Sequence, residues 1–512
     1  MNKVVGIDLG TTNSAIAALD DIGKPKMIAN QDGGNITPSV IFFEGDNVIV
    51  GEEAKKATQY APEKCIRFVK RSMQKEDAVI KVEGKSFSPE QASSLILKKI
   101  VQDFEQLEGK ISEAVITVPA NFNNIARDRT MAAAKIAGLN VNHIINEPTA
   151  AALFYATKTQ LSGRIVIYDL GGGTFDVTAC EVNGNDIEIL TSFGIQELGG
   201  HDFDEKLIDF FEKKLQSEHN MSLFETNKDL DKVKYEYEIE QIKKTLSKRD
   251  KTIFTVSTKE GPKNLSITKN EFEEIISLYV SQTELQLDSL CAELNLKPGD
   301  FTNVLLVGGS TRIPAFRESV KQYFGKEPLT EVNVDEAVAL GACIYAGMKT
   351  ESSNLNAAQK SAVDSVKLQE ITNHNFGIII QEYNESKNIM EQKVRIMIGK
   401  NSVIPTEFKD TFYTVLANQT EVPLTVTQDT FGSDNPKMVK TIGEMMLGPL
   451  PAGRDEGQPI EITYKYNSSG VMECKFLDVN SKVEKEADIE VKGTSAKDIE
   501  SSTEELEMFI LE

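Results

Sequence analysis

The sequence predicts an α/β fold over residues 1–350 and an all-β sandwich over residues 375–495. In the first region, apolar strand-like runs alternate with helical segments, which is typical of α/β proteins. In the second region, short apolar segments separated by turn residues follow one another without helices, which indicates a β-sandwich. A chain of 512 residues is long enough to form both.

Composition excludes several classes of partner. The formal net charge is −22, and a surface this acidic repels nucleic acid and anionic membranes, so we expect neither as a partner. No apolar run approaches the length of a membrane span, and the N-terminus lacks a secretory pattern. The five cysteines are scattered without a C-x-x-C, and the four histidines show no metal-ligand spacing. This pattern favours free thiols in a reducing compartment, so we expect a cytoplasmic location.

The α/β region can be divided into elements in chain order. Residues 112–122 predict a strand that ends at Pro119, and residues 123–140 predict a helix that stops at Gly138. Residues 164–193 predict three strands, with a glycine turn after the first and an Asn183–Gly184 hairpin turn after the second. Two long helices are then expected, over 228–249 and from the Thr268–Glu271 capping box to about Leu294; residues 301–320 predict a buried strand, a glycine turn and a helix.

The composition becomes polar after this region, so residues 351–374 are predicted to form an interdomain linker. Seven strands are expected beyond it, in the segments 375–380, 393–399, 412–417, 422–428, 459–466, 471–476 and 487–491. Residues 496–512 predict a short acidic helix or a frayed tail.

Two glycine turns repeat one pattern. Asp8 and Asp169, 169 − 8 = 161 residues apart, each end an apolar strand and precede a glycine-bearing turn. Such a repeat suggests a duplicated architecture with two lobes facing one cleft. Backbone N–H groups at residues 10–12 and 171–174 would then bind phosphate, and the two aspartates would hold Mg²⁺ through waters. The alternative is a pair of ordinary hairpin turns.

A third turn, "VGGSTR" over residues 307–312, also follows a buried strand. It could pass the backbone under an adenosine, with Arg312 stacked on the base; a strand-to-helix packing turn is the alternative. The sequence contains neither G-x-x-x-x-G-K-[ST] nor G-x-G-x-x-G, so the P-loop and the dinucleotide fingerprint do not apply.

The segments "IDLGTTNS", "IYDLGGGTFDVT" and "VLLVGGSTRIP" resemble the signature segments of the seventy-kilodalton heat-shock chaperones of the bacterial type. "ITVPANF", "INEPTAAAL", "ELGGHDFD" and "VDEAVALGA" match in the same order, and the resemblance covers about residues 1–495. It implies an actin-like, ribonuclease H-like duplicated ATPase domain of two lobes, then a β-sandwich that binds extended apolar segments of unfolded polypeptides. It also implies slow, peptide-stimulated hydrolysis of ATP to ADP and phosphate.

The resemblance assigns roles to individual residues. It implies catalytic roles for Lys70, Glu147, Thr174 and Asp176, and a metal-binding role for Asp8 and Asp169. It places the nucleotide against Gly10, Thr11, Thr12, Asn13, Gly171, Gly172, Gly173, Gly199, Gly200, Glu240, Lys243, Ser247, Gly308, Gly309, Ser310, Arg312 and Asp335. The implied cofactors are ATP or ADP and Mg²⁺, with K⁺ as a further candidate ion.

In the second domain, the resemblance places Ile378, Ile380, Phe412, Val422 and Leu424 around a peptide pocket, and it makes Pro119 and Arg127 an allosteric relay between the domains. The five apolar residues could equally be plain sandwich core. Implied partners are unfolded polypeptides, a J-domain co-chaperone and a nucleotide exchange factor, with the chain mostly monomeric.

The sequence departs from the family in four places, two of them single residues: His143, where many members have an arginine tied to J-protein contact, and Val334, where proline is usual. The family linker is an apolar leucine run, whereas here only Val366, Leu368 and Ile371 are apolar, so we expect weaker docking of the linker on the ATPase domain. The chain also stops where a long helical lid would begin, so peptide should exchange fast. Two other functions remain open on the same scaffold: a small-molecule kinase, and an accessory protein that binds nucleotide with weak hydrolysis and regulates another chaperone.

Overall fold

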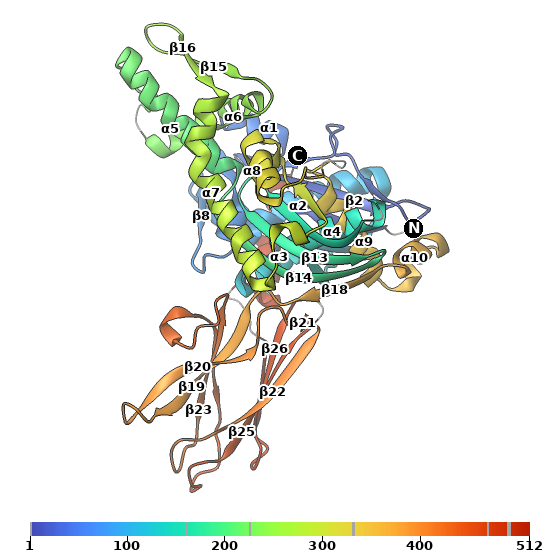
Figure 1. The fold of residues 1–512 in the computed structure, drawn as a ribbon, viewed down its shortest axis with the longest axis vertical. Helices are drawn as coiled ribbons and strands as arrows, with labels where there is room; N and C mark the ends of the chain where they lie inside the picture. The colour runs from blue at the N-terminus through green and yellow to red at the C-terminus, as the bar shows by residue number, and fades with distance from the viewer. Residues whose placement is uncertain are drawn as a thin grey trace.

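The computed structural model describes residues 3–159, 161–224, 227–329, 333–467, 470–488 and 493–511. An α/β part and a β-rich part follow one another along the chain and lie at opposite ends of the molecule (Figure 1). Within the described residues no helix is both long and apolar enough to cross a membrane, and no disulfide joins any two of the cysteines.

The first body of the α/β part, here called lobe I, is built on the sheet β11-β10-β1-β2-β3, with β4 paired to β2. Strand β1 runs parallel to β10 and antiparallel to β2. The turn from β1 into β2 therefore lies at the same end of the sheet as the carboxyl end of β10. Its strands are β1 (Lys3–Asp8), β2 (Asn13–Leu19), β3 (Pro25–Met27), β4 (Thr37–Pro38), β10 (Ile111–Val118) and β11 (His143–Asn146).

Lobe I also carries two smaller sheets, β28-β6-β5-β7 and β8-β9. These comprise β5 (Val40–Glu44), β6 (Asn47–Val50), β7 (Cys65–Arg67), β28 (Ile510–Leu511), β8 (Ile80–Val82) and β9 (Lys85–Phe87). Its helices are α1 (Glu52–Ala57), η1 (Pro62–Lys64), η2 (Val69–Ser72), α2 (Pro89–Glu108) and α3 (Asn124–Ile136). The expected strand ending at Pro119 and the helix stopping at Gly138 are confirmed, and Gly138 has the positive φ of a helix stop.

The second body, lobe II, is built on the sheet β17-β12-β13-β14-β18-β21 and the hairpin β15-β16. Its strands are β12 (Ser162–Leu170), β13 (Phe175–Asn183), β14 (Asp186–Ile195), β15 (Lys251–Val256), β16 (Lys263–Thr268), β17 (Asn303–Val307), β18 (Lys367–Ile371) and β21 (Val403–Ile404). Its helices are α5 (Gly200–His219), α6 (Lys228–Leu246), α7 (Lys269–Leu294), η3 (Pro298–Asp300), η4 (Gly309–Arg312) and α8 (Pro314–Phe324). The capping box that begins α7 forms as expected from Thr268 and Glu271.

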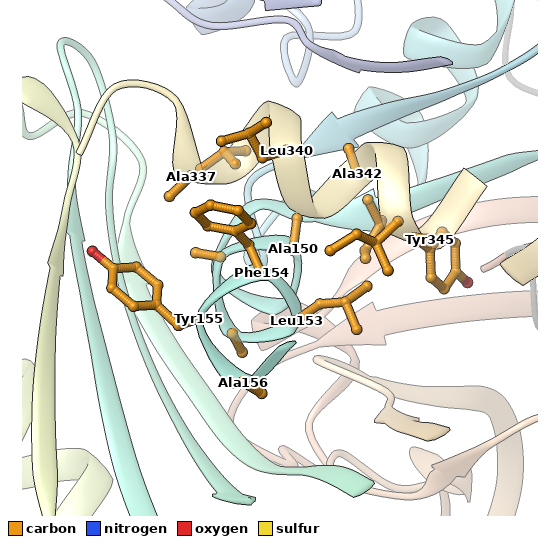
Figure 2. Packing of buried hydrophobic residues seen from close by; sticks show 14 of the residues in the cluster. Ala150, Leu153, Phe154, Tyr155, Ala156, Ala337, Leu340, Ala342 and Tyr345 are labelled. Carbon is orange, nitrogen blue, oxygen red and sulfur yellow. The ribbon is translucent and has the colours of Figure 1, made fainter. Parts of the chain in front are cut away.

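Two helices, α4 (Glu147–Thr159) and α9 (Ala337–Lys349), pack against each other between the sheets of the two lobes (Figure 2). Helix α9 crosses α4 so closely that a Cβ on Gly341 would lie 1.7 Å from the Ala150 carbonyl oxygen. These helices hold the alanine-rich segments "INEPTAAAL" and "VDEAVALGA", so small side chains there permit the close approach of two backbones.

The β-rich part contains two four-stranded antiparallel sheets, β20-β19-β23-β24 and β22-β25-β26-β27. The strands are β19 (Asn375–Asn384), β20 (Ile389–Ile398), β22 (Thr406–Tyr413), β23 (Val422–Asp429), β24 (Lys440–Leu447), β25 (Pro459–Tyr466), β26 (Met472–Asp478) and β27 (Glu484–Asp488), with the turn η6 (Pro436–Met438). Side chains from both sheets share one buried cluster, as in a sandwich.

The strand expected over 412–417 is wrong in extent, because β22 ends at Tyr413; strand β24 has no counterpart in the sequence prediction. The last expected strand, 487–491, lies partly outside the described residues.

The predicted linker is largely ordered. It contains η5 (Ser352–Asn354), α10 (Ala357–Asp364) and β18, and β18 pairs in parallel with β14 of lobe II. The linker is therefore docked on lobe II, and the strength of that docking stays a prediction. Backbone pairing does not require an apolar sequence, and Val366 and Ile371 are nevertheless buried.

The tail is also ordered, and of the two sequence alternatives the helix is confirmed. Helix α11 (Ala496–Leu506) packs against α3, and β28 pairs in parallel with β6 of lobe I. The C-terminus accordingly lies on the α/β part of the molecule and not at the far end of the sandwich (Figure 1).

Candidate functional site

The two glycine corners face each other across the gap between the lobes. A Cβ on Gly172 would lie 2.4 Å from the Thr12 side chain, and one on Gly173 would lie 2.4 Å from that of Thr11. Only glycine therefore allows the lobe II corner to approach the lobe I corner this closely. The repeat found in the sequence thus places two turns on one cleft.

Other glycines extend the lobe II corner. The N–H groups of Gly200 and His201 donate to the carbonyls of Gly171 (3.1 Å) and Gly172 (2.9 Å). The Ser310 hydroxyl also donates to Gly171, at 2.8 Å. The start of α5, the turn "VGGSTR" and the second corner therefore form one backbone assembly on lobe II.

A cavity opens between the corners. Fourteen of the residues singled out in the sequence line it: Asp8, Gly10, Thr11, Thr12, Asn13, Lys70, Glu147, Asp169, Gly171, Gly172, Thr174, Gly308, Gly309 and Asp335. Gly173, Gly199 and Asp176 do not line it. Gly173 and Gly199 pack against each other, and Asp176 is paired with Asp169 in the β12-β13 ladder directly behind the cavity wall.

Asp8, Glu147 and Asp169 crowd the inner end of this cavity, and a fourth carboxylate, Asp176, lies behind its wall. Burial, reinforced by the neighbouring Glu147, raises the pKa of Asp8 to about 7. The same two causes raise the pKa values of Asp169 and Asp176 well above the ordinary range. Carboxylates whose pKa values are raised in this way repel one another when they are ionised. The site therefore favours a bound cation.

Lys70 is the cation held among these groups. Its Nζ donates to the Leu9 carbonyl at 2.6 Å and forms an ion pair with Glu147. Asp8 is oriented by the Thr117 hydroxyl, which donates to Oδ1 at 2.9 Å. Since one ammonium faces four carboxylates, the site is short of positive charge.

These residues fit a hydrated divalent ion. In the described part of the chain, no three His, Cys, Asp or Glu side chains lie close enough to ligate a metal directly. The buried Asp176 Oδ1 has no hydrogen-bond partner among the described residues, so it can accept from water. Mg²⁺ keeps much of its hydration shell, which suits carboxylates that reach it through waters.

A larger cavity of about 660 Å³ adjoins the first and shares its walls at Thr12, Gly172 and Asp335, among others. Glu240, Lys243 and Ser247, expected on one face of a helix, all line it from α6, and Gly200, Ser310 and Arg312 line it from other elements of lobe II. Arg312 pairs with Asp335 at 2.5 Å. The sequence hypothesis that the α6 face and the third glycine turn share one pocket is consistent with this geometry.

Several residues at or near this cavity were missed by the sequence reasoning; Lys55 and Arg67 line it, and Arg71 does not. Arg71 binds Asp202 and donates to the Gly173 carbonyl at 3.0 Å, Arg67 pairs with Glu236 at 2.5 Å, and Lys55 pairs with Glu240 at 2.5 Å. Burial would raise the pKa of Glu240, but Lys55, Lys244 and Lys243 bring it down to about 2. All three contacts join lobe I to lobe II, and only the position of Arg71 beside Lys70 could have suggested its role.

The apolar residues expected around a peptide pocket come together in the sandwich. Ile378 and Leu424 are buried in its core, and Ile380, Phe412 and Val422 are partly buried against the same cluster. The first two residues are therefore core, as the alternative interpretation has it; the other three retain exposed surface, and their place in a peptide pocket stays a prediction.

Arg127, one of the two residues expected to relay a signal, lies where the parts of the molecule meet. Arg127 is buried, and its Nη2 donates to Asn146 Oδ1 at 2.6 Å. On the sandwich side, a Cβ on Gly470 would lie 3.6 Å from Arg127 Nη1. Pro119 accepts a hydrogen bond from the Phe122 N–H in the turn that leads to α3.

Further contacts join the sandwich to both lobes. Lys440 pairs with Glu76 of lobe I at 3.1 Å, and Asn401 donates to Glu293 of lobe II at 2.7 Å. The sandwich therefore contacts the same two bodies that enclose the cavities.

A comparison with models of protein families matches residues 4–511 to the family described as "Hsp70 protein". The match covers nearly the whole chain.

Proposed function

The chain belongs to the Hsp70 family, and we propose that it binds ATP with Mg²⁺ between its two glycine corners. It is a molecular chaperone whose binding of unfolded polypeptides is regulated by ATP, and it is an ATPase. The proposal rests on one observation above all: the corners at Thr11–Thr12 and Gly172–Gly173 meet across a cavity lined with carboxylates.

The arrangement assigns a task to each side chain of the inner cavity. Backbone N–H groups of both corners would bind phosphate oxygens, and Thr174, which lines the cavity, would contact the terminal phosphate. The Lys70 ammonium, held by Leu9 and Glu147, offsets the negative charge that develops when the terminal phosphoryl group is transferred to water. Asp176, with an unpartnered carboxylate oxygen, positions the attacking water.

Asp8, Asp169 and Glu147 would hold Mg²⁺ through its waters. When bound, the ion supplies positive charge that neutralises the phosphates and the carboxylates together. The adenosine would occupy the larger cavity, between the α6 face of Glu240, Lys243 and Ser247 and the turn that holds Arg312. K⁺ remains a further candidate ion at this site.

Domain boundaries and partners belong to the same proposal. We infer an actin-like ATPase domain over residues 1–350, a peptide-binding sandwich over 375–495 and a connecting segment between them. A J-domain co-chaperone and a nucleotide exchange factor are the proposed partners, and the cytoplasm is the proposed location. The contacts of Arg127 with both parts support its role, with Pro119, in coupling nucleotide to peptide.

ATP turnover by the full chain, with and without an extended apolar peptide, tests the proposal. We expect the peptide to stimulate turnover in the wild type. Lys70→Ala should lower turnover about 100-fold or more, because it removes charge stabilisation of the transition state, while ADP binding measured by calorimetry persists. Lys110→Ala, at a lysine whose side chain is 80% exposed, is the matched control and should change neither quantity.

Three outcomes would contradict the proposal. Phosphate appearing on a metabolite would favour the kinase alternative, and nucleotide binding without turnover would favour the accessory protein. Full turnover in Lys70→Ala would remove the assigned role of this lysine.

A further inference from the structure

Two aromatic rings stack across the gap between the lobes. The centroids of the Phe68 and His201 rings lie 3.9 Å apart, with the planes inclined by 30°. Phe68 lies between β7 and η2 of lobe I, and His201 is the second residue of α5 in lobe II. Both rings line the larger cavity, so the contact joins the two lobes at the wall of the proposed nucleotide pocket.

The backbone of Phe68 is held in an unfavourable conformation. Its φ is 55° and its ψ is 29°, the left-handed region that residues with a side chain larger than that of glycine adopt only at a cost in free energy. Arg67 supports the ring from lobe I, with its guanidinium 5.1 Å from the ring centroid, while pairing with Glu236 of lobe II. Such strain persists only where surrounding contacts fix the conformation, and here those contacts come from both lobes.

Each ring is rigidly connected to the site. Phe68 precedes Lys70 by two residues in the same turn, and Lys70 binds the carbonyl of Leu9 at the first corner. His201 follows Gly199 and Gly200, and its own N–H donates to Gly172 of the second corner. A change in the separation of the two rings therefore changes the separation of the two corners.

The environment keeps the imidazole neutral. Burial, together with Arg71, Arg67, Lys243 and Lys232, lowers the pKa of His201 to about 3, and Nδ1 has no hydrogen-bond partner among the described residues. A neutral, poorly solvated ring is stabilised by stacking on another aromatic ring. Such a stack in general changes the equilibrium constant between the stacked and separated states by a factor of about 2 to 10.

We propose that the Phe68–His201 stack is a positioning contact that holds the lobes closed over bound nucleotide and thereby slows its release. The inference rests on the proposed function, since it takes the cavity to be the nucleotide pocket. Neither ring needs to contact the nucleotide, because the contact acts through the distance between the corners to which the rings are attached.

Release of a fluorescent ADP from the full chain, chased with excess unlabelled ADP, measures this effect. Phe68→Ala and His201→Ala should each speed release about 2- to 10-fold. The double variant should release no faster than the faster single variant, because each single change already removes the whole stack. His201→Phe retains a stacking ring and should stay within about twofold of the wild type.

Tyr60→Ala is the matched control. Tyr60 is 72% exposed and contacts the ring of Phe42. The substitution therefore removes an aromatic contact made within lobe I, and it should leave the rate of ADP release unchanged. In the two single variants, the rate of single-turnover hydrolysis of bound ATP should change less than the rate of ADP release. This comparison separates a contact that holds the lobes closed from a general disruption of the site.

Unchanged release in both single variants, or a double variant whose effect is the product of the two, would overturn the inference. Should Phe68→Ala fail to fold, the pair His201→Ala and His201→Phe decides the matter, since only loss of the ring should speed release. A wild-type chain that binds no fluorescent ADP would instead refute the proposed function, so the two failures are distinguishable.

Discussion

The segment 367–371 and the tail 495–511 both add a strand to the α/β part and both bury apolar side chains, but they differ in how much backbone pairing holds them. Strand β18 lies between β14 and β21, whereas β28 is the edge strand of its sheet. Strand β18 extends the sheet of lobe II, and the Lys367 N–H donates to the Asn185 carbonyl at 2.9 Å. The tail adds β28 to lobe I, and it is held by apolar side chains: Leu506 is buried, and Phe509 packs on Phe43 and Phe87.

This difference explains why the two segments respond differently to sequence reasoning. Backbone pairing accepts almost any side chain, so "KLQEI" gives little hydropathy signal although it forms part of a sheet. Burial of Leu506 and Phe509 depends on side chains, yet both lie in a segment rich in acidic residues, and the aromatic partners of Phe509 are more than 400 residues away in the chain. Changes to the backbone should therefore loosen β18, and changes to side chains should loosen the tail.

The largest expected effect is at Leu506. Its side chain is 3% exposed within the lobe I core, so Leu506→Ala should destabilise docking of the tail by about 2–4 kcal/mol. Hydrogen exchange of α11 measures the loss as faster exchange confined to the tail. Met508→Ala, at a residue that is 63% exposed, should leave this exchange unchanged. Equal effects of both variants would show that side-chain burial does not hold the tail.

A smaller effect is expected at the backbone of β18. Lys367→Pro removes the N–H that binds Asn185, and we expect a cost of about 1–3 kcal/mol to docking of the segment. Limited proteolysis of residues 349–375 should become faster, and stimulation of ATP turnover by peptide should decrease. Lys367→Ala retains the N–H at an exposed position and serves as the control. Protection that survives the proline would show that side chains hold this segment.

The smallest expected effect is that docking of the segment around β18, unlike docking of the tail, depends on pH. Burial, with Arg127 and Lys400 nearby, lowers the pKa of His374 to about 3. In the undocked or unfolded chain the His374 imidazole is protonated below about pH 6.5. Docking therefore loses stability as the pH falls below that value, by about 1 kcal/mol at pH 5.5. Proteolysis of residues 349–375 should therefore be faster at pH 5.5 than at pH 7.5.

The tail contains no histidine and provides the internal comparison for this measurement. His374→Gln should remove most of the pH dependence at the linker. An unchanged pH dependence in this variant would assign the effect to other groups.

The sequence predicted the glycine corners well because their requirements are local. Gly10, for example, cannot carry a Cβ, which would lie 1.9 Å from the Asn13 carbonyl oxygen within the same turn. Strand β24 was missed because Gly443 and Glu444 interrupt the alternation of its side chains, and it is recognised only by its pairing with β23. The cross-lobe contacts of Arg67, Phe68 and Arg71 were missed because nothing near them in the chain indicates partners on the other lobe.

The amino-acid sequence alone determined the order of the elements, the two aspartate-bearing turns and the division into an α/β and an all-β region. These features follow from hydrophobic periodicity and from glycines whose conformations are set by near neighbours. Only the tertiary structure decided how closely the two turns approach each other, that two aromatic rings stack between the lobes, and that the segment 367–371 and the tail join existing sheets. Such contacts depend on the relative placement of whole elements, which no short stretch of sequence encodes.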